Sequence, residues 1–214
     1  MNFKYYKTVP LIITLLVLSV LFKILTAWLD SFLSTHPRLK EVLDYIDCFS
    51  VVGLITITFT IINFLGWKWW AFKWLVDIPN LNGRYEGTLI SSYLTPAGIQ
   101  VEKRCVMEIK QSASSIHIKS YFGDINNNNL SPTSSSYSIS EELELQKDGF
   151  FKLSYIFTNE SEILVQLNNH LGTASFKYYN DIKKLKGEYY NQRQNNGKIE
   201  VVFVQKKLLG RLER

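Results

Sequence analysis

Seven polar and aromatic side chains after residue 79 have the chemistry to bind an aromatic, anionic ligand such as a nucleotide. Tyrosine and arginine can stack on bases, and arginine, lysine, serine and asparagine can donate hydrogen bonds to phosphate oxygens. All of them lie in stretches where residue character alternates with period two, as in a β-strand. The candidate ligand-binding residues selected by this alternation are Tyr85, Ser91, Lys103, Tyr155, Tyr189, Asn191 and Arg193.

The same residues also fit a purely structural role. A tyrosine on the inner face of a sheet can pack its ring in the core and leave its hydroxyl at the rim. Arg193 is the strongest of the candidates, because a guanidinium in this position suits a phosphate partner. For the tyrosines, both interpretations are open from the sequence alone.

Eight short strands are predicted to position these side chains. The predicted strands are 83–93, 99–111, 114–123, 134–146, 150–158, 170–179, 184–193 and 198–207. The links Thr95–Gly98, Lys147–Gly149 and Gln194–Gly197 contain the Pro, Gly, Asn and Asp residues of tight turns. Successive strands with short links predict an antiparallel, up-and-down, lipocalin-like β-barrel, whose interior holds side chains or one small ligand.

The alternation also predicts which residues face the interior. Most inward sets are apolar at one end and polar or aromatic at the other, which indicates a filled floor and a polar mouth. In the fourth strand, Tyr137, Ile139, Leu143 and Leu145 are predicted to face inward together. A β-bulge would shift this assignment, because it inserts one extra residue into a strand.

Two apolar runs precede the strands. Val9–Leu29 has a single charge, Lys23, and Cys48–Leu65 has none. About 20 apolar residues suffice for a helix to cross a bilayer, and the Trp-rich segment after the second run is typical of a membrane interface. The first run is too long for a signal peptide and has no cleavage site after it. The sequence therefore predicts two transmembrane helices.

The charges that flank the two runs predict the topology. Lys4 and Lys7 precede the first run, and Lys68, Lys73 and Arg84 follow the second. Lysine and arginine favour the cytoplasmic side, so both termini are expected in the cytoplasm, with a short external hairpin. Residues 1–78 are predicted to form a two-helix transmembrane domain and residues 79–214 a cytoplasmic ligand-binding barrel. The predicted location is the bacterial inner membrane.

Lys23 has two interpretations. Its ammonium can snorkel to the membrane surface, or it can make a polar contact within an oligomer of the helices. The second run contains Thr56, Thr58, Thr60 and Asn63, which can form hydrogen bonds between helices. Self-association through these segments is therefore an open possibility.

Composition excludes several classes of protein. A chain that is 46% hydrophobic, with a net charge of +5, is neither disordered nor a coat for nucleic acid. Cys48 and Cys105 are too few for a disulfide scaffold and are predicted to be free thiols. His36, His117 and His170 lie at no metal-ligand or catalytic spacing. The sequence predicts a protein that is not an enzyme and needs no metal or cofactor.

Two motifs carry a resemblance to a known family. They are Pro79-Asn-Leu-Asn-Gly83-Arg-Tyr85-Glu-Gly87 at the first strand and Gly187-x-Tyr189-x-Asn191-x-Arg193 near the end. Together with the two apolar runs, they resemble the bacterial SMODS-associating two-transmembrane β-strand-rich effectors of CBASS antiphage defence, also known as CD-NTase-associated membrane effectors. The architectural resemblance covers the whole chain.

The resemblance implies a function. A phage-activated CD-NTase makes a cyclic di- or oligonucleotide, and the barrel binds it. The effector then forms a homo-oligomer, and its helices disrupt the lipid bilayer of the inner membrane, so that the infected cell dies before the phage matures. Two other functions fit the sequence: a membrane-anchored barrel for a lipid or other apolar ligand, and a structural subunit that holds a partner protein. A pocket lined only by apolar groups would favour the former, and a solidly packed barrel the latter.

Overall fold

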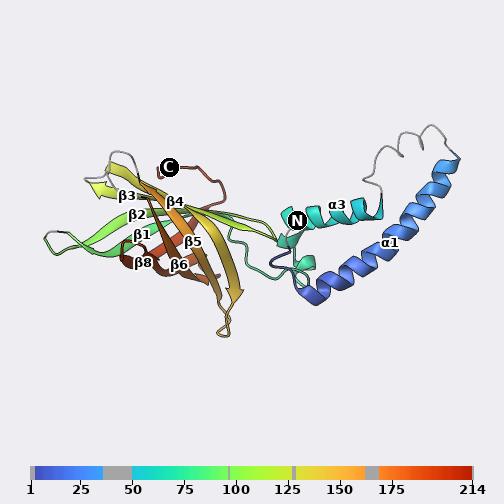
Figure 1. Ribbon diagram of the computed structural model, residues 1–214, viewed down its shortest axis with the longest axis horizontal. Helices are drawn as coiled ribbons and strands as arrows, with labels where there is room; N and C mark the ends of the chain where they lie inside the picture. The colour runs from blue at the N-terminus through green and yellow to red at the C-terminus, as the bar shows by residue number, and fades with distance from the viewer. Residues whose placement is uncertain (1–2, 36–49, 96, 127–128, 162–168, 214) are drawn as a thin grey trace. The chain divides into compact units, whose positions relative to one another are not determined.

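The computed structural model describes residues 3–35, 50–95, 97–126, 129–161 and 169–213 (Figure 1). The chain divides into two compact units. The first contains residues 1–78 together with Ser112–Ser115, and the second contains Pro79–Gln111 and Ile116–Arg214.

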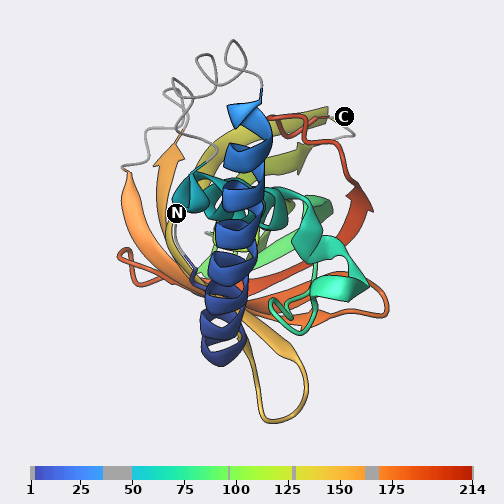
Figure 2. The same cartoon turned by 90° about the vertical axis from the view of Figure 1, so that its right-hand side faces the viewer.

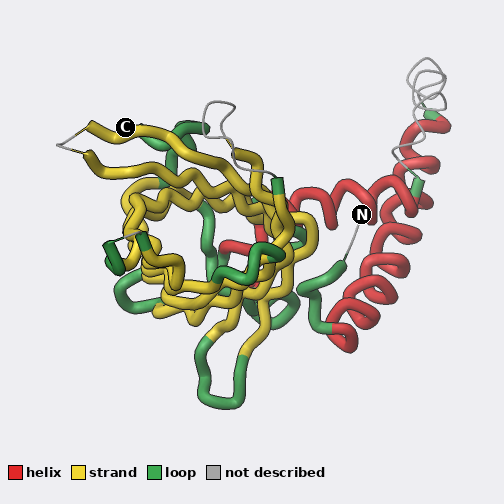
Figure 3. Tube along the Cα trace, turned by 60° about the vertical axis from the view of Figure 1, so that its left-hand side comes forward, coloured by secondary structure: helices red, strands yellow, loops and turns green. Residues whose placement is uncertain are grey.

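The second unit is a closed barrel of eight strands. The strands are β1 (Gly83–Leu94), β2 (Gln100–Gln111), β3 (Ile116–Asn126), β4 (Asn129–Leu145), β5 (Phe151–Ser161), β6 (His170–Tyr179), β7 (Lys184–Asn191) and β8 (Asn196–Gln205). Each strand pairs antiparallel with the next in sequence, and β8 pairs back with β1, which closes the ring seen in Figure 3. The predicted eight-stranded up-and-down barrel is confirmed, and closure leaves no exposed strand edge.

Glycines allow β1 to approach β8 closely and β7 to approach β6 closely. A Cβ atom on Gly87 would overlap the carbonyl oxygen of Glu200 in β8, and one on Gly187 would overlap that of Ser175 in β6. Only glycine fits where two backbones meet in this way. Both glycines belong to the motifs noted in the sequence, so part of each motif serves the fold.

The predicted inner face of β4 is wrong in its first half. The register between β4 and β5 shifts between Ser138 and Ser140, which places Ile139 in a bulge. Tyr137 and Ile139 are consequently exposed, whereas Leu143, which follows the bulge, is buried as predicted. Leu145, the last residue of the strand, was also predicted to face inward but is exposed. The extra residue reverses the side-chain alternation, so serines face inward before the bulge.

The floor of the barrel is a packed apolar core. Its fully buried members include Cys105, Met107, Ile109, Leu153, Phe176, Leu185 and Val201. Cys105 is a free thiol, and its burial raises its pKa to about 12. Cys48, the other predicted free thiol, lies outside the described residues.

A buried ionic network lies on the outer face of β1 and β2. Arg84 is fully buried and donates hydrogen bonds to Glu86 at 2.8 Å and to Glu108 at 3.0 Å. Further N–H groups of the same guanidinium donate hydrogen bonds to the carbonyl oxygens of Arg211 at 2.6 Å and Leu212 at 2.7 Å. The C-terminal segment therefore folds back over the barrel wall, and its backbone satisfies a buried cation.

The same C-terminal segment is held by apolar packing. Leu212 forms a small buried cluster with Val106 and Tyr121. The Glu108 carboxylate also accepts hydrogen bonds from the backbone N–H groups of Leu209 and Gly210. Charge and packing thus fix this segment to one site on the wall.

The first unit contains one helix long enough to span a membrane. Helix α1 (Thr8–Ser34) is continuous (Figure 2), and its apolar part, Thr8–Phe32, has a mean hydropathy of 2.4 with none of its most apolar window buried. At about 1.5 Å per residue, 25 residues exceed the thickness of the hydrocarbon core. The first predicted span is supported by this length and composition.

The second predicted span is not reproduced as a full-length helix. Helix α3 (Val51–Phe64) has 14 residues, or about 21 Å, which is shorter than the hydrocarbon core. The helical pattern predicted between Leu39 and Ile46 lies outside the described residues. The described part of the chain therefore has one clear transmembrane candidate instead of two.

The segment after α3 packs into a small core of the first unit. Two short 3₁₀ helices, η2 (Gly66–Lys68) and η3 (Trp70–Phe72), follow α3. The core contains Tyr6, Phe59, Ile62, Trp67, Leu75, Val76 and Ala113. Trp67, predicted to be an interfacial residue, is thus buried, whereas Trp69, Trp70 and Trp74 are exposed.

Candidate functional site

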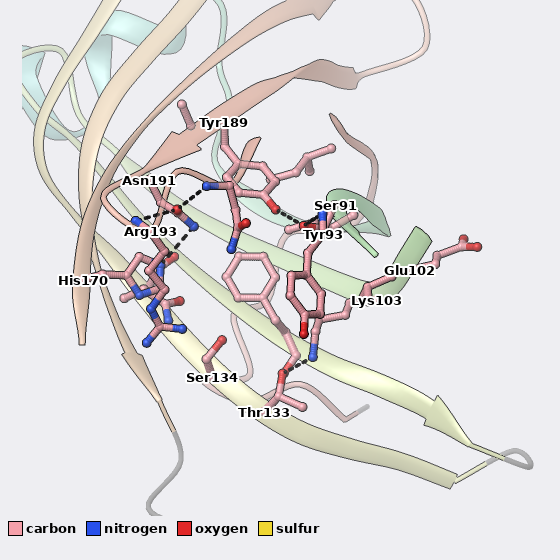
Figure 4. Close-up of a pocket in the computed structure, with 18 of the residues that line it drawn as sticks. Ser91, Tyr93, Glu102, Lys103, Thr133, Ser134, His170, Tyr189, Asn191 and Arg193 are labelled. Carbon is pink, nitrogen blue, oxygen red and sulfur yellow. Dashed lines mark hydrogen bonds between the residues drawn. The ribbon is translucent and has the colours of Figure 1, made fainter. Parts of the chain in front are cut away.

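A pocket of about 750 Å³ opens at the end of the barrel where β1 meets β2 and β7 meets β8 (Figure 4). This volume is typical of small-molecule sites. Its apolar lining includes Leu89, Val101, Phe122, Ala174 and Ile199. The lining also includes hydroxyl, amide, imidazole and charged groups, so the pocket offers both apolar and polar contacts.

Six of the seven residues selected from the sequence line this pocket. They are Ser91, Lys103, Tyr155, Tyr189, Asn191 and Arg193. Tyr85 does not line it: the side chain is buried in the floor, where its ring meets that of Phe203 edge-on at 5.6 Å. Tyr85 lies only two residues from the start of β1, at the end away from the pocket, where its side chain packs in the core.

Ser91 on β1 and Tyr189 on β7 contact each other across β8, which lies between these two strands. The Tyr189 hydroxyl donates a hydrogen bond to the Ser91 Oγ at 3.1 Å, and both side chains are buried. The Ser91 Oγ also accepts from the backbone N–H of Tyr93 at 3.2 Å. Burial raises the pKa of Tyr189 above its ordinary value, so the hydroxyl stays protonated and remains a donor.

Lys103 lies on β2 and is held by groups from the next two strands, β3 and β4. Its ammonium donates hydrogen bonds to the Asp124 carboxylate at 2.8 Å and to the Thr133 hydroxyl at 3.2 Å. Thr133 in turn donates to the carbonyl oxygen of Phe122 at 3.2 Å. The lysine side chain is about one quarter exposed, so its charge is accessible from the pocket while its position is defined.

Asn191 shapes the turn that carries Arg193. Its Oδ1 accepts hydrogen bonds from the backbone N–H groups of Arg193 and Asn195, both at 3.1 Å. Because the oxygen is used in this way, the Asn191 amide nitrogen faces His170, with its Nδ2 3.4 Å from the His170 Nε2. The left-handed backbone of Gln194, with φ of 61°, completes the turn. Asn191 is therefore a positioning residue for Arg193.

Aromatic rings form the deep wall of the pocket. The Tyr155 ring stacks on Phe176 with centroids 5.9 Å apart and lies 6.1 Å from the ring of Phe157. Burial raises the pKa of the Tyr155 hydroxyl well above its ordinary value. Tyr155 is only 6% exposed, so it presents an edge to the pocket and is largely a packing residue.

Several lining residues were not among the sequence candidates. They are Tyr93, Thr133, Ser134, Ser136, Phe157, Asn159 and His170. Ser134 and Ser136 were missed because the bulge at Ile139 reverses the alternation of β4. His170 was missed because it begins a strand, where periodicity has too few residues to assign a face. Only a prediction that included the bulge at Ile139 would have assigned these serines to the inner face.

The chemistry of the pocket is that of binding. It combines the cations Lys103 and Arg193 with hydroxyl and amide donors and with aromatic rings, whereas Glu102 and Asp124 are its acidic residues. Among the described residues, no group of three or more His, Cys, Asp or Glu side chains is arranged to hold a metal ion. The arrangement suits an organic ligand that carries both an apolar part and negative charge.

The fold and pocket define a class of protein: an antiparallel β-barrel with one ligand-sized pocket, preceded by an apolar helix of membrane-spanning length. The comparison with protein families agrees with this class. Residues 76–202 match the family described as Cap15, cyclic dinucleotide receptor domain. The match covers more than half of the chain, so the chain belongs to this family. No curated protein matches it.

The family match confirms the resemblance to CBASS membrane effectors that the sequence motifs indicated. The matched region begins just before Pro79 and ends within β8, so it covers nearly all of the barrel. The family is described as a receptor domain and not as an enzyme.

Proposed function

We propose that this chain is the membrane effector of a CBASS antiphage system and that its barrel binds a cyclic nucleotide in the pocket at the mouth. The observation that carries the proposal is the pocket itself, in a chain of the cyclic dinucleotide receptor family. Lys103 and Arg193 supply positive charge for phosphates. The rings of Tyr93 and Tyr189 supply surfaces for bases.

The pocket offers two positively charged groups to the phosphates of the proposed ligand. Lys103 comes from β2 and Arg193 from the β7–β8 turn, so two cations reach the pocket from different strands. A cyclic dinucleotide has two phosphates, and charge-assisted hydrogen bonds to phosphate oxygens are among the strongest that a protein makes. A lipid or other apolar ligand would make no use of the positive charge of these two groups, which argues against that alternative.

Membrane disruption is the proposed output. In this proposal α1 anchors the protein in the inner membrane, the 48–65 run supplies a second apolar segment, and both termini are cytoplasmic. Ligand binding drives formation of a homo-oligomer, and the assembled helices disrupt the bilayer and kill the infected cell. A CD-NTase supplies the ligand. For this switch to work, the ligand must bind the assembled state more tightly than the resting state.

Calorimetric titration of the full chain in detergent micelles tests the binding step. The panel contains cyclic di- and trinucleotides, a linear dinucleotide as a control for phosphate charge alone, and a fatty acid as the apolar alternative. We expect micromolar or tighter binding of one cyclic nucleotide and none of the fatty acid. Binding of the fatty acid alone would support the apolar-ligand function, and binding of neither by the folded protein would overturn the proposal.

Sedimentation velocity with and without the bound nucleotide tests the assembly step. The expected result is a larger sedimentation coefficient in the presence of ligand. An unchanged coefficient at saturating ligand would separate nucleotide binding, which would stand, from ligand-driven assembly, which would not.

A further inference from the structure

The end of the barrel opposite the pocket has a concentration of lysines. In an up-and-down barrel alternate connections share an end, so the β2–β3, β4–β5 and β6–β7 turns lie together with the start of β1 and the end of β8. Lysines at this end are Lys147, Lys183, Lys184, Lys206 and Lys207. The acidic residues in the same turns are Asp148 and Asp181, which leaves the end basic.

The pocket end differs in charge. The β1–β2 and β7–β8 connections, Thr95–Ile99 and Gln192–Asn195, contain one charged residue between them, Arg193. These two connections therefore carry far less charge than the turns at the opposite end, so the lysines are not spread evenly over a chain with a net charge of +5.

Part of this positive charge has no internal partner. Lys184 pairs with Glu200, but Lys206 and Lys207 are exposed and form no ion pair with any other described residue. Lys147 likewise is exposed at the tip of the β4–β5 turn. These ammonium groups are available for an external anion.

Exposed apolar side chains lie beside the lysines. Ile182, in the β6–β7 turn, is 54% exposed and directly precedes Lys183. Leu208 follows Lys207 and is 39% exposed. Apolar tips flanked by lysines are typical of segments that lie in the head-group region of a membrane, where the apolar group reaches the acyl boundary and the ammonium meets phosphate.

The chain connects this end to the first unit. β1 begins at Gly83, five residues after Ile78, the last residue of the first unit before the barrel. The β2–β3 turn, Ser112–Ser115, is itself part of the first unit, which also contains the candidate span α1. The chain that leaves the unit with the proposed membrane anchor therefore enters the barrel at its basic end.

We infer that the basic end, defined by Lys147, Ile182, Lys183, Lys206, Lys207 and Leu208, binds the anionic phospholipid head groups of the membrane that α1 spans. Each lysine near an anionic surface adds to the attraction, and the attraction falls with salt. Docking at this end leaves the opposite end, with its pocket, open to ligands from solution. The inference rests on the membrane anchor of the proposed function but not on nucleotide binding.

The test uses the full chain reconstituted in two kinds of vesicle, phosphatidylcholine alone and phosphatidylcholine with phosphatidylglycerol. A fluorescent probe is attached at Ile182→Cys, with Cys48→Ser to leave one accessible thiol, and brominated lipids quench it at the head-group boundary. We expect at least about twofold stronger quenching in the anionic vesicles, and loss of the difference at high salt. The matched control is a probe at Ala97→Cys in the β1–β2 connection, which should respond equally in both vesicles.

Charge reversal supplies the second arm. Lys206→Glu with Lys207→Glu should abolish the lipid-dependent quenching, whereas Lys198→Glu, an exposed lysine of β8 close to the pocket end, should not. Equal quenching in both lipids while α1 resists alkaline extraction would overturn this inference alone. Extraction of the protein from both vesicles would overturn the membrane anchor and this inference with it, while nucleotide binding would be unaffected.

Discussion

The ammonium group of Lys103 lies 2.8 Å from the carboxylate of Asp124 on the wall of the pocket. One of the two cations available to the proposed ligand is thus partly neutralised by an internal anion. A phosphate that approaches Lys103 competes with Asp124 for the ammonium group. The Lys103–Asp124 pair therefore fixes the position of the lysine and also lowers the affinity for a phosphate.

Removing the carboxylate should therefore strengthen nucleotide binding. We expect Asp124→Asn to tighten binding by up to about fivefold, because partly exposed charges interact by about 0–1 kcal/mol. Lys103→Met should weaken binding by about 10- to 100-fold, since a hydrogen bond to a charged group contributes about 1.5–3 kcal/mol. Calorimetric titration measures both variants, and weaker binding by Asp124→Asn would show that the pair acts as a unit.

Arg193 should contribute to binding and little to the fold. Arg193→Ala is expected to weaken nucleotide binding by about 10- to 100-fold while the thermal unfolding midpoint stays unchanged. Arg193→Lys should recover only part of the affinity, because an ammonium lacks the bidentate geometry of a guanidinium. If Arg193→Ala binds the nucleotide as tightly as the parent, the β7–β8 turn is not part of the binding site.

Asn191 provides a matched test of positioning. Asn191→Ala loses the acceptor that fixes the backbone of Arg193 and Asn195, so it should weaken binding although Arg193 is still present. The double variant with Arg193→Ala should bind no more weakly than Arg193→Ala alone, because residues in one network are not additive. Independent, additive losses would instead indicate that Asn191 contacts the ligand directly.

Arg84 should be critical for stability and not for binding. Its guanidinium is fully buried between Glu86 and Glu108, so Arg84→Met should destabilise the barrel by about 3–5 kcal/mol, the usual cost of leaving a buried charge uncompensated. Arg104→Met, which removes a partly exposed partner of Glu86, should cost less. Urea unfolding followed by circular dichroism measures both, and equal losses would contradict this assignment.

Stability should fall at alkaline pH. Burial raises the pKa of Cys105 from 9.0 to about 12 and raises the pKa values of Tyr85 and Tyr155. The folded state therefore binds these protons more tightly than the unfolded state, so this stabilisation is fully present below about pH 9 and is lost as the pH rises toward about 12. Urea unfolding at pH 7, 9 and 10.5 measures the decline, which should be shallower in Tyr155→Phe. A constant free energy of unfolding across this range would contradict the burial of these groups.

Much of the fold could be predicted from local sequence. Period-two alternation and turn residues located all eight strands, because both signals are properties of a few consecutive residues. The apolar run around α1 likewise predicted a helix of spanning length from composition alone. The second run was not matched by a helix of spanning length, because α3 (Val51–Phe64) has only 14 residues, and the Trp67 that follows it is buried in the core of the first unit.

The candidate site was predicted where alternation is regular and missed where it is not. Ser91, Lys103 and Tyr189 line the pocket as the alternation predicted, and β7, which carries Tyr189, keeps one register with both of its neighbours. Tyr85 has the same parity as Ser91, but its depth in the barrel is set by where β1 begins, and parity carries no information on depth. Serines of β4 replaced Tyr137 in the lining because a bulge reversed the strand's faces.

The sequence by itself determined the elements of this protein, their order and the chemical types available to the pocket, since each depends on local composition and spacing. Tertiary structure alone decided which side chains meet. The pairing of Lys103 with Asp124, 21 residues away, and the burial of Arg84 beneath the carbonyl of Leu212, 128 residues away, depend on strand register and on closure of the barrel. Such contacts are fixed by backbone hydrogen bonding across the whole sheet, which no local pattern in the sequence records.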